Sequence, residues 1–156
     1  MAVPGCLICG YLTEDLSVLF QTEHWVAQLA VEQGYLGHTF ITATEHTASL
    51  SDLPEDQWQD LHRTIRRFEN GLREATGARV FNWVCLMNDG FKHPDPQTHV
   101  HWKVRPRYDH PVKIAGTEFS DPNFAHHYDK SRDHDHMAPP GSGLRADIEH
   151  HLKGHF

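Results

Sequence analysis

The segment from Ser51 to Gly77 constrains the fold most, because it has the pattern of one long amphipathic helix. Apolar side chains recur there at steps of three and four residues, which places them on one face of a helix of about six turns. Ser51 or Asp52 is suited to cap the helix start, Pro54 to its first turn and Gly77 to its end. The apolar face requires a partner surface, and it consists of Trp58, Leu61, Ile65, Phe68, Leu72 and Ala75.

Strand-like segments on both sides of this helix supply the partner surface. Most of them follow one another through short turns such as Thr22–Glu23, which favours antiparallel pairing. One segment, residues 79–88, is so apolar that we expect it at the centre of the sheet. The sequence therefore predicts an α+β fold, with a mostly antiparallel sheet of about five strands and one long helix packed on it. The predicted strands span residues 17–21, 24–31, 38–43, 79–88 and 98–105.

Composition limits the class of protein. The 156 residues suit one domain with a single core. No apolar run approaches the roughly 18 residues of a membrane helix, and the first residues lack the pattern of a signal peptide, so we expect a cytoplasmic protein without a membrane partner. The net charge of −7 argues against nucleic-acid binding, although a locally positive site can still hold a small anion.

The composition shifts from about residue 109 to few apolar residues and many turn formers. We expect a domain over residues 1–116 and a histidine-rich extension over 117–156 that is an extended surface segment or a partly ordered tail. Phe119 and Phe124 are its best anchors. Seven of the fifteen histidines lie from His126 onward, where they are either solvated or a metal buffer. The last residues predict a short helix with Leu144, Ile148 and Leu152 on one side.

The stretch "THVHWKVRPR" predicts a strand that presents His99, His101 and Lys103 on one face, with apolar side chains on the other. The two imidazoles then stand about 7 Å apart along the strand. Imidazole is a nucleophile, a proton carrier near neutral pH and a metal ligand. A single histidine is more often a polar group with ordinary hydrogen bonds, but this pair favours a chemical role.

Cys6 and Cys9 form a CxxC pair at the start of the chain. From spacing alone the pair is half of a zinc site, a redox pair or a coincidence. A redox pair usually follows a strand, and the first ten residues contain none. A zinc site needs two further ligands, for which His46 and His99 are candidates. Cys85, inside the apolar segment, is expected to be buried and inert.

The chain resembles the histidine triad (HIT) superfamily over about residues 5–128. The resemblance is carried by "CLICGYL", by "GYLGHTFITATEHTASLSDL", and by "MNDG" ahead of "HVHWKVRPRY". The phrase "GTEFSDPNFAHHY" resembles an extension found in some prokaryotic members. The resemblance implies a HIT-like five-stranded antiparallel sheet with a long helix, usually in a two-fold homodimer. We expect its interface at residues 79–88 and at the helix face formed by Trp58, Phe68 and Leu72.

The resemblance also implies chemistry at the α-phosphate of a nucleotide or nucleotide conjugate. His101 matches the histidine that attacks phosphorus to give a nucleotidyl-histidine intermediate. His99 matches the first triad position, which orients that nucleophile. Asn88 matches an amide-bearing position that contacts phosphate, and His38 is the second expected substrate contact. In zinc-bearing members the ligands of a structural zinc match Cys6, Cys9, His46 and His99.

Three positions depart from the family pattern. Lys103 replaces the third histidine, and with an unperturbed pKa of about 10.4 it is a poor general acid, although it offers charge and donors. Ala30 stands where many members carry Asp or Asn to hold ribose hydroxyls, and Pro96 where Ser or Thr often contacts phosphate. Two hypotheses follow: a nucleotide-phosphate hydrolase or transferase acting through His101, or a zinc-stabilised nucleotide-binding or regulatory module with little catalysis.

Overall fold

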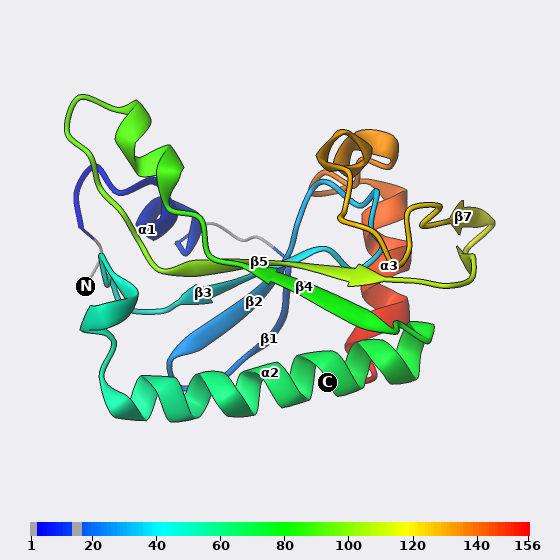
Figure 1. Ribbon diagram of the computed structural model, residues 1–156, viewed down its shortest axis with the longest axis horizontal. Helices are drawn as coiled ribbons and strands as arrows, with labels where there is room; N and C mark the ends of the chain where they lie inside the picture. Colours follow the sequence, from blue (N-terminus) through cyan, green and yellow to red (C-terminus); the bar gives the residue numbers. More distant parts are fainter. Residues whose placement is uncertain (1–2, 14–16) are drawn as a thin grey trace.

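A five-stranded sheet with a long helix on one face forms the centre of the protein (Figure 1). The computed structural model describes residues 3–13 and 17–156. All four neighbouring strand pairs are antiparallel, which confirms the predicted α+β fold. The strands lie in the order β1 (Val18–Gln21), β2 (Trp25–Leu29), β3 (Thr39–Ala43), β5 (His101–Arg107), β4 (Val80–Val84).

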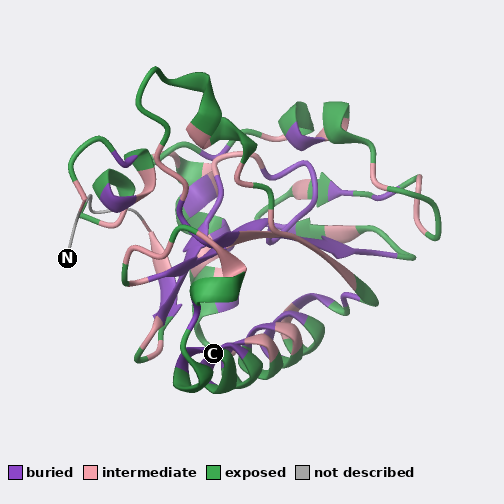
Figure 2. Cartoon of the chain, turned by 60° about the vertical axis from the view of Figure 1, so that its left-hand side comes forward, coloured by how far each residue is buried: buried purple, intermediate pink, exposed green. Residues whose placement is uncertain are grey.

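The long helix α2 (Glu55–Thr76) runs beneath the sheet and turns its buried side towards it (Figure 2). Leu61, Phe68 and Leu72 are buried there, as the apolar pattern predicts, whereas Trp58 is 41% exposed. Because Phe68 and Leu72 face the core of their own chain, the expectation that they take part in a dimer interface is wrong.

The two ends of α2 differ in how well the sequence predicts them. Gly77 ends the helix in the left-handed conformation with φ of 73°, as expected. The predicted caps are wrong, because Ser51 and Asp52 lie in the preceding 3-10 turn η1 (Leu50–Asp52) and the N-cap is Pro54. A residue before proline is held extended, so Leu53 separates η1 from α2.

Strand β4 lies at the edge of the sheet, so the prediction that residues 79–88 are central is wrong. Its hydrophobicity has another cause: the rings of Phe81 and Trp83 pack edge-on against Phe68 of α2. Val80 is 48% exposed and Leu86 46% exposed, which leaves apolar surface at this edge.

The C-terminal extension is attached to the domain by buried ion pairs, although most of its residues from 117 to 143 are exposed. Arg105 and Arg107 of β5 form buried ion pairs with its Asp133 and Asp121. These polar pairs attach the surface segment where apolar side chains are few, and of its two expected apolar anchors Phe119 is buried and Phe124 is half-buried. The predicted terminal helix is confirmed, with Ile148 and Leu152 buried and Leu144 half-buried. The elements here are β6 (Val112–Ile114), β7 (Thr117–Phe119), η3 (Lys130–Asp135) and α3 (Gly143–Lys153).

Two short elements stand on the face of the sheet opposite α2: α1 (Leu7–Tyr11) and η2 (Asn88–Lys92) (Figure 1). In the part of the chain that the structure describes, no helix is both long enough and apolar enough to cross a membrane.

Candidate metal centre and catalytic pocket

The two cysteines are brought together by the first turn of α1. Cys6 is the N-cap residue of this helix, and the Cys9 backbone N–H donates to the Cys6 Sγ at 3.4 Å. Both side chains are buried, and burial raises the pKa of the Cys6 thiol. A bound cation would counter this effect by stabilising the thiolate.

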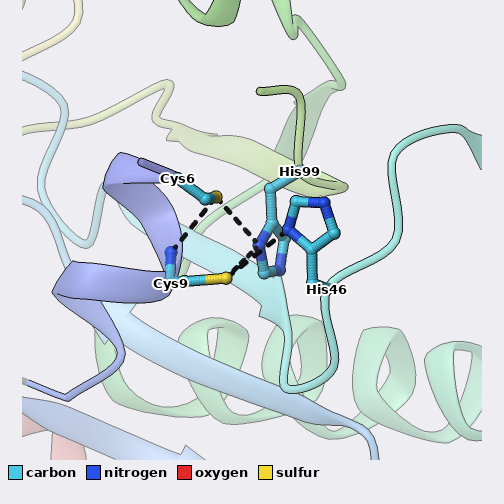
Figure 3. A group of neighbouring side chains, drawn as sticks. All are labelled: Cys6, Cys9, His46 and His99. Carbon is cyan, nitrogen blue, oxygen red and sulfur yellow. Dashed lines mark hydrogen bonds between the residues drawn. The ribbon is translucent and has the colours of Figure 1, made fainter. Parts of the chain in front are cut away.

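Two histidines complete the cluster (Figure 3). The Cys9 Sγ lies 3.5 Å from Nδ1 of both His46 and His99, and the Cys6 Sγ lies 3.7 Å from the His99 Nδ1. Tetrahedral zinc, with bonds of about 2.3 Å to sulfur and about 2.1 Å to nitrogen, places those atoms about 3.6 Å apart. The four ligand atoms all lie within 4.8 Å of one another, so the cluster is compatible with zinc.

The hydrogen bonding of His99 leaves its Nδ1, the ring nitrogen nearest the cysteine sulfurs, free to bind a metal. Its Nε2 lies 2.8 Å from the carbonyl oxygen of Ala43, which can only accept, so Nε2 carries the proton. Nδ1 therefore turns a lone pair towards the sulfurs. Burial lowers the pKa of His99, which favours this neutral form. A ligating histidine typically makes such a second hydrogen bond through its other nitrogen.

The same reasoning identifies the free nitrogen of His101. Its Nδ1 lies 2.8 Å from the carbonyl oxygen of His99, so Nδ1 is the donor and Nε2 keeps its lone pair. The pKa of His101 is lowered by burial first and by the charge of Lys103 among the smaller causes. The arrangement presents an oriented, neutral imidazole nitrogen of the type that acts as a nucleophile.

A cavity of about 430 Å³ lies on the face of the sheet opposite α2, and His101 is one of its lining residues. Strand residues including Lys103 and Phe40 line it, with the Lys103 Nζ 5.4 Å from the centre of the Phe40 ring. Helix α1 adds an apolar wall, and the loop around η2 adds polar groups. Lys103 offers a positive charge to a phosphate and the wall offers a surface to an apolar or aromatic part of a ligand, while Glu32, Asp89 and Asp95 also line the cavity.

The structure brings some of the expected site residues together and separates others. His99 and His101 line the cavity with Lys103, although β5 begins at His101 and extends to Arg107, past the predicted 98–105. Asn88 is exposed at the start of η2, and its neighbours Met87 and Asp89 line the cavity in its place.

His38, Ala30 and Pro96 differ in their relation to this cavity. His38 is buried outside the cavity lining, with its Nδ1 3.0 Å from the carbonyl oxygen of Glu32. Ala30 lines the cavity. Pro96 is exposed, between the lining residues Asp95 and Gln97.

Arg145 of α3 is a cavity residue that the sequence analysis missed. Its guanidinium is buried and donates to the carbonyl oxygens of Leu29 at 2.6 Å and Ala30 at 3.3 Å. It thereby attaches the extension to β2 beside the cavity. The sequence "GLRADIEHHLK" predicts that Arg145 lies on a short helix, but no sequence pattern predicts which distant carbonyl oxygens its side chain contacts.

Comparisons with known proteins agree with this fold. An uncharacterised HIT-like protein of Methanocaldococcus jannaschii is 24% identical over 106 residues, which are 67% of this chain and 80% of that protein. The crystal structure of a hypothetical histidine triad nucleotide-binding protein from Sulfolobus tokodaii has a TM-score of 0.61 and 16% identity, covering 96% of this chain and 93% of that chain.

A zinc-bound histidine triad family protein from Mycobacterium smegmatis has a TM-score of 0.52 and 22% identity, covering 94% of each chain. Identities this low show the fold alone. The sequence itself decides the family, because the model of the HIT domain matches residues 13–111, well over half of the chain. The chain therefore belongs to the HIT domain family.

Proposed function

We propose that this protein is a nucleotide-phosphate hydrolase or nucleotidyl transferase that acts at the α-phosphate through His101. One observation carries the proposal: the hydrogen bond from the His101 Nδ1 to the His99 carbonyl leaves Nε2 unprotonated in a cavity that also contains Lys103. Membership of the HIT family supports a nucleotide ligand and this reaction class.

The reaction has two displacements. The His101 Nε2 attacks the α-phosphorus, so that an N–P bond forms while the P–O bond to the leaving group breaks and its electron pair departs with the leaving group. A water or acceptor hydroxyl then attacks the same phosphorus and releases its proton to solvent, while the N–P bond breaks and its electron pair returns to the His101 Nε2. Lys103, two residues along the strand, stabilises the negative charge that develops on the leaving side.

We further propose that zinc at Cys6, Cys9, His46 and His99 is structural, and that the chain is a zinc-bearing HIT protein with lysine at the third triad position. The compatible distances and the zinc-bound neighbour from Mycobacterium smegmatis support this. Bound zinc would cross-link these segments, and because four protein ligands would hold it, no position would be open for substrate. The chain's own contribution is to attach α1 to the segment that orients His101.

We also propose a homodimer whose subunits meet at the exposed edge of β4. This edge has unpaired backbone groups and half-exposed apolar side chains, and such an edge tends to pair with another strand.

The test is covalent labelling with a panel of α-³²P nucleotides. Wild-type protein should acquire an acid-labile label on His101, and His101→Ala should acquire none. His62→Ala, on the exposed side of α2, is the matched control and should label like the wild type. Nucleotide binding without label or turnover would contradict the enzyme proposal and favour a binding or regulatory module.

A further inference from the structure

Helix α1 forms the apolar wall of the cavity without joining the core of the domain. Its residues Leu7, Ile8 and Tyr11 line the cavity, and the side chains of Leu7 and Tyr11 are about half exposed, at 51% and 50%. None of the half-buried apolar side chains in residues 3–13 packs against the hydrophobic core. The wall therefore lacks the apolar attachment that holds α2 and α3 in place.

The two cysteines make the polar contacts between α1 and the sheet. The backbone hydrogen bonds of residues 3–13 stay within this segment, as in the bond from the Leu12 N–H to the Ile8 carbonyl at 3.1 Å. The contacts that leave the segment run from the Sγ atoms to His46 and His99 (Figure 3). Among the residues that the structure describes, no other hydrogen bond joins α1 to the rest of the chain.

This attachment is weak unless the cluster holds a metal ion. A thiol is a weak donor and a weak acceptor, so contacts between sulfur and imidazole contribute little by themselves. Four bonds to a bound zinc ion, in contrast, would fix Cys6 and Cys9 firmly against His46 and His99. The position of the apolar wall should therefore depend on whether the cluster is occupied.

The cationic part of the cavity is held in place without a metal. His101 and Lys103 belong to β5, which pairs with β3 on one side and with β4 on the other. The carbonyl that orients His101 belongs to His99, and the Nε2 of His99 has its own hydrogen bond to the Ala43 carbonyl oxygen at 2.8 Å. These contacts persist when the cluster is empty, so the two halves of the cavity differ in how they are supported.

We propose that occupancy of the cluster of Cys6, Cys9, His46 and His99 controls the affinity of the cavity for the apolar part of its ligand and leaves its affinity for phosphate unchanged. Given the proposed function, on which this inference rests, that apolar part is a nucleobase, and α1 packs against it. Protein without metal then binds phosphate normally but distinguishes poorly between phosphate and a nucleotide. The cluster thereby regulates ligand selection as well as supporting the fold.

The experiment measures the dissociation constants of inorganic phosphate and of the ribonucleoside 5′-monophosphates by calorimetry, on the zinc-loaded full chain and on the same chain after chelation. In loaded protein the best monophosphate should bind at least about tenfold more tightly than phosphate, because a base gains that much by stacking on side chains. After chelation this advantage should fall to about twofold or less, while the dissociation constant of phosphate changes by less than about twofold.

Two variants separate the wall from the metal. Tyr11→Ala should retain zinc, since Tyr11 is not a member of the cluster, and should lose at least about fivefold of the monophosphate advantage. Phe91→Ala is the matched control, because Phe91 is an aromatic residue that is 71% exposed on η2 but does not line the cavity. It should bind both kinds of ligand like the wild type.

The proposal is overturned if loaded protein shows no preference for any monophosphate, or if the preference survives chelation. It is also overturned if chelation weakens phosphate binding in parallel or unfolds the chain by circular dichroism, because the metal would then support more than α1. A folded, zinc-containing Tyr11→Ala with the full preference would likewise contradict it. Covalent labelling of His101 in loaded protein is a separate measurement, so failure of the proposed reaction and failure of the metal control can be told apart.

Discussion

His38 is a buried residue whose charged form this fold strongly disfavours. The side chain is 2% exposed in total, and its Nε2 has no hydrogen-bond partner among the described residues. Burial lowers the pKa of His38 to about 4, with a further contribution from the charge of Arg105. Lys103 acts in the same direction and Asp133 opposes it, so these three groups set the balance around the ring.

The position of His38 predicts a loss of stability in weak acid. The unfolded chain, with a histidine pKa of about 6.5, takes up the proton first, so the free energy of unfolding falls as the pH drops from about 6.5 towards about 4. At pH 5 this amounts to about 2 kcal/mol. Urea unfolding at pH 7 and pH 5 should show a smaller pH effect in His38→Asn than in wild type. Equal pH effects in the two proteins would refute the assignment.

Lys103 should act by charge and not by proton donation. Lys103→Met should slow turnover of every substrate, by roughly 100-fold, because a preorganised charge is lost from the transition state. Lys103→His should selectively improve substrates with poor leaving groups, since imidazole can protonate them near neutral pH. The check is kcat/KM across a series of leaving groups of rising pKa. A Lys103→His effect that is uniform across the series would contradict this role.

At the scale of elements, the docking of η3 depends on the missing side chain of Gly34. Gly34→Ala places a methyl group against the Arg132 carbonyl, so η3 must shift away from the β2–β3 loop. We expect a loss of about 1–3 kcal/mol in the free energy of unfolding and faster hydrogen exchange over residues 129–138. Gly143→Ala is the control, because a Cβ there meets nothing within 4 Å. Equal stability of the two variants would show that the contact is unimportant.

The link between α1 and β5 should depend on metal. Purified protein should contain about one zinc per chain, and Cys6→Ser should release it and lower the melting temperature. Cys85→Ser should keep the metal, since Cys85 lies outside the cluster and is only half-buried. Elemental analysis that finds no stoichiometric metal in protein prepared without chelator would rule out the zinc proposal.

Elements with a periodic residue pattern can be predicted from the sequence, whereas the docking of segments through single polar contacts cannot. The periodic apolar residues of α2 and the alternation in β5 predict both elements, and the types and spacing of Cys6 and Cys9 suggest a metal. The pair between Arg105 and Asp133 spans 28 positions in the sequence and has no periodicity. Edge and central strands also look alike in sequence, because either packs one apolar face on a helix, as Phe81 of β4 does.

At the scale of the whole molecule, the open edge of β4 predicts assembly. Light scattering should give about twice the chain mass of 17.9 kDa. Val80→Lys should shift the protein towards monomer, because the charge falls on the apolar edge. Phe91→Lys is the control: Phe91 is 71% exposed, but it belongs to η2 and not to β4, so the dimer should persist. A monomer mass for wild type at micromolar concentration would contradict the proposed interface.

One strand joins the working parts of this molecule. His99 lies two residues before the start of β5, His101 and Lys103 lie in its first half, and Arg105 and Arg107, which hold the extension, lie in its second half. β3 and β4 flank this strand and the extension is bound to its two arginines, so it cannot be released while the rest of the fold persists. A batch that retains half of its activity after heating in the presence of zinc should therefore be a mixture of fully competent and fully unfolded molecules, without a population of damaged but folded ones.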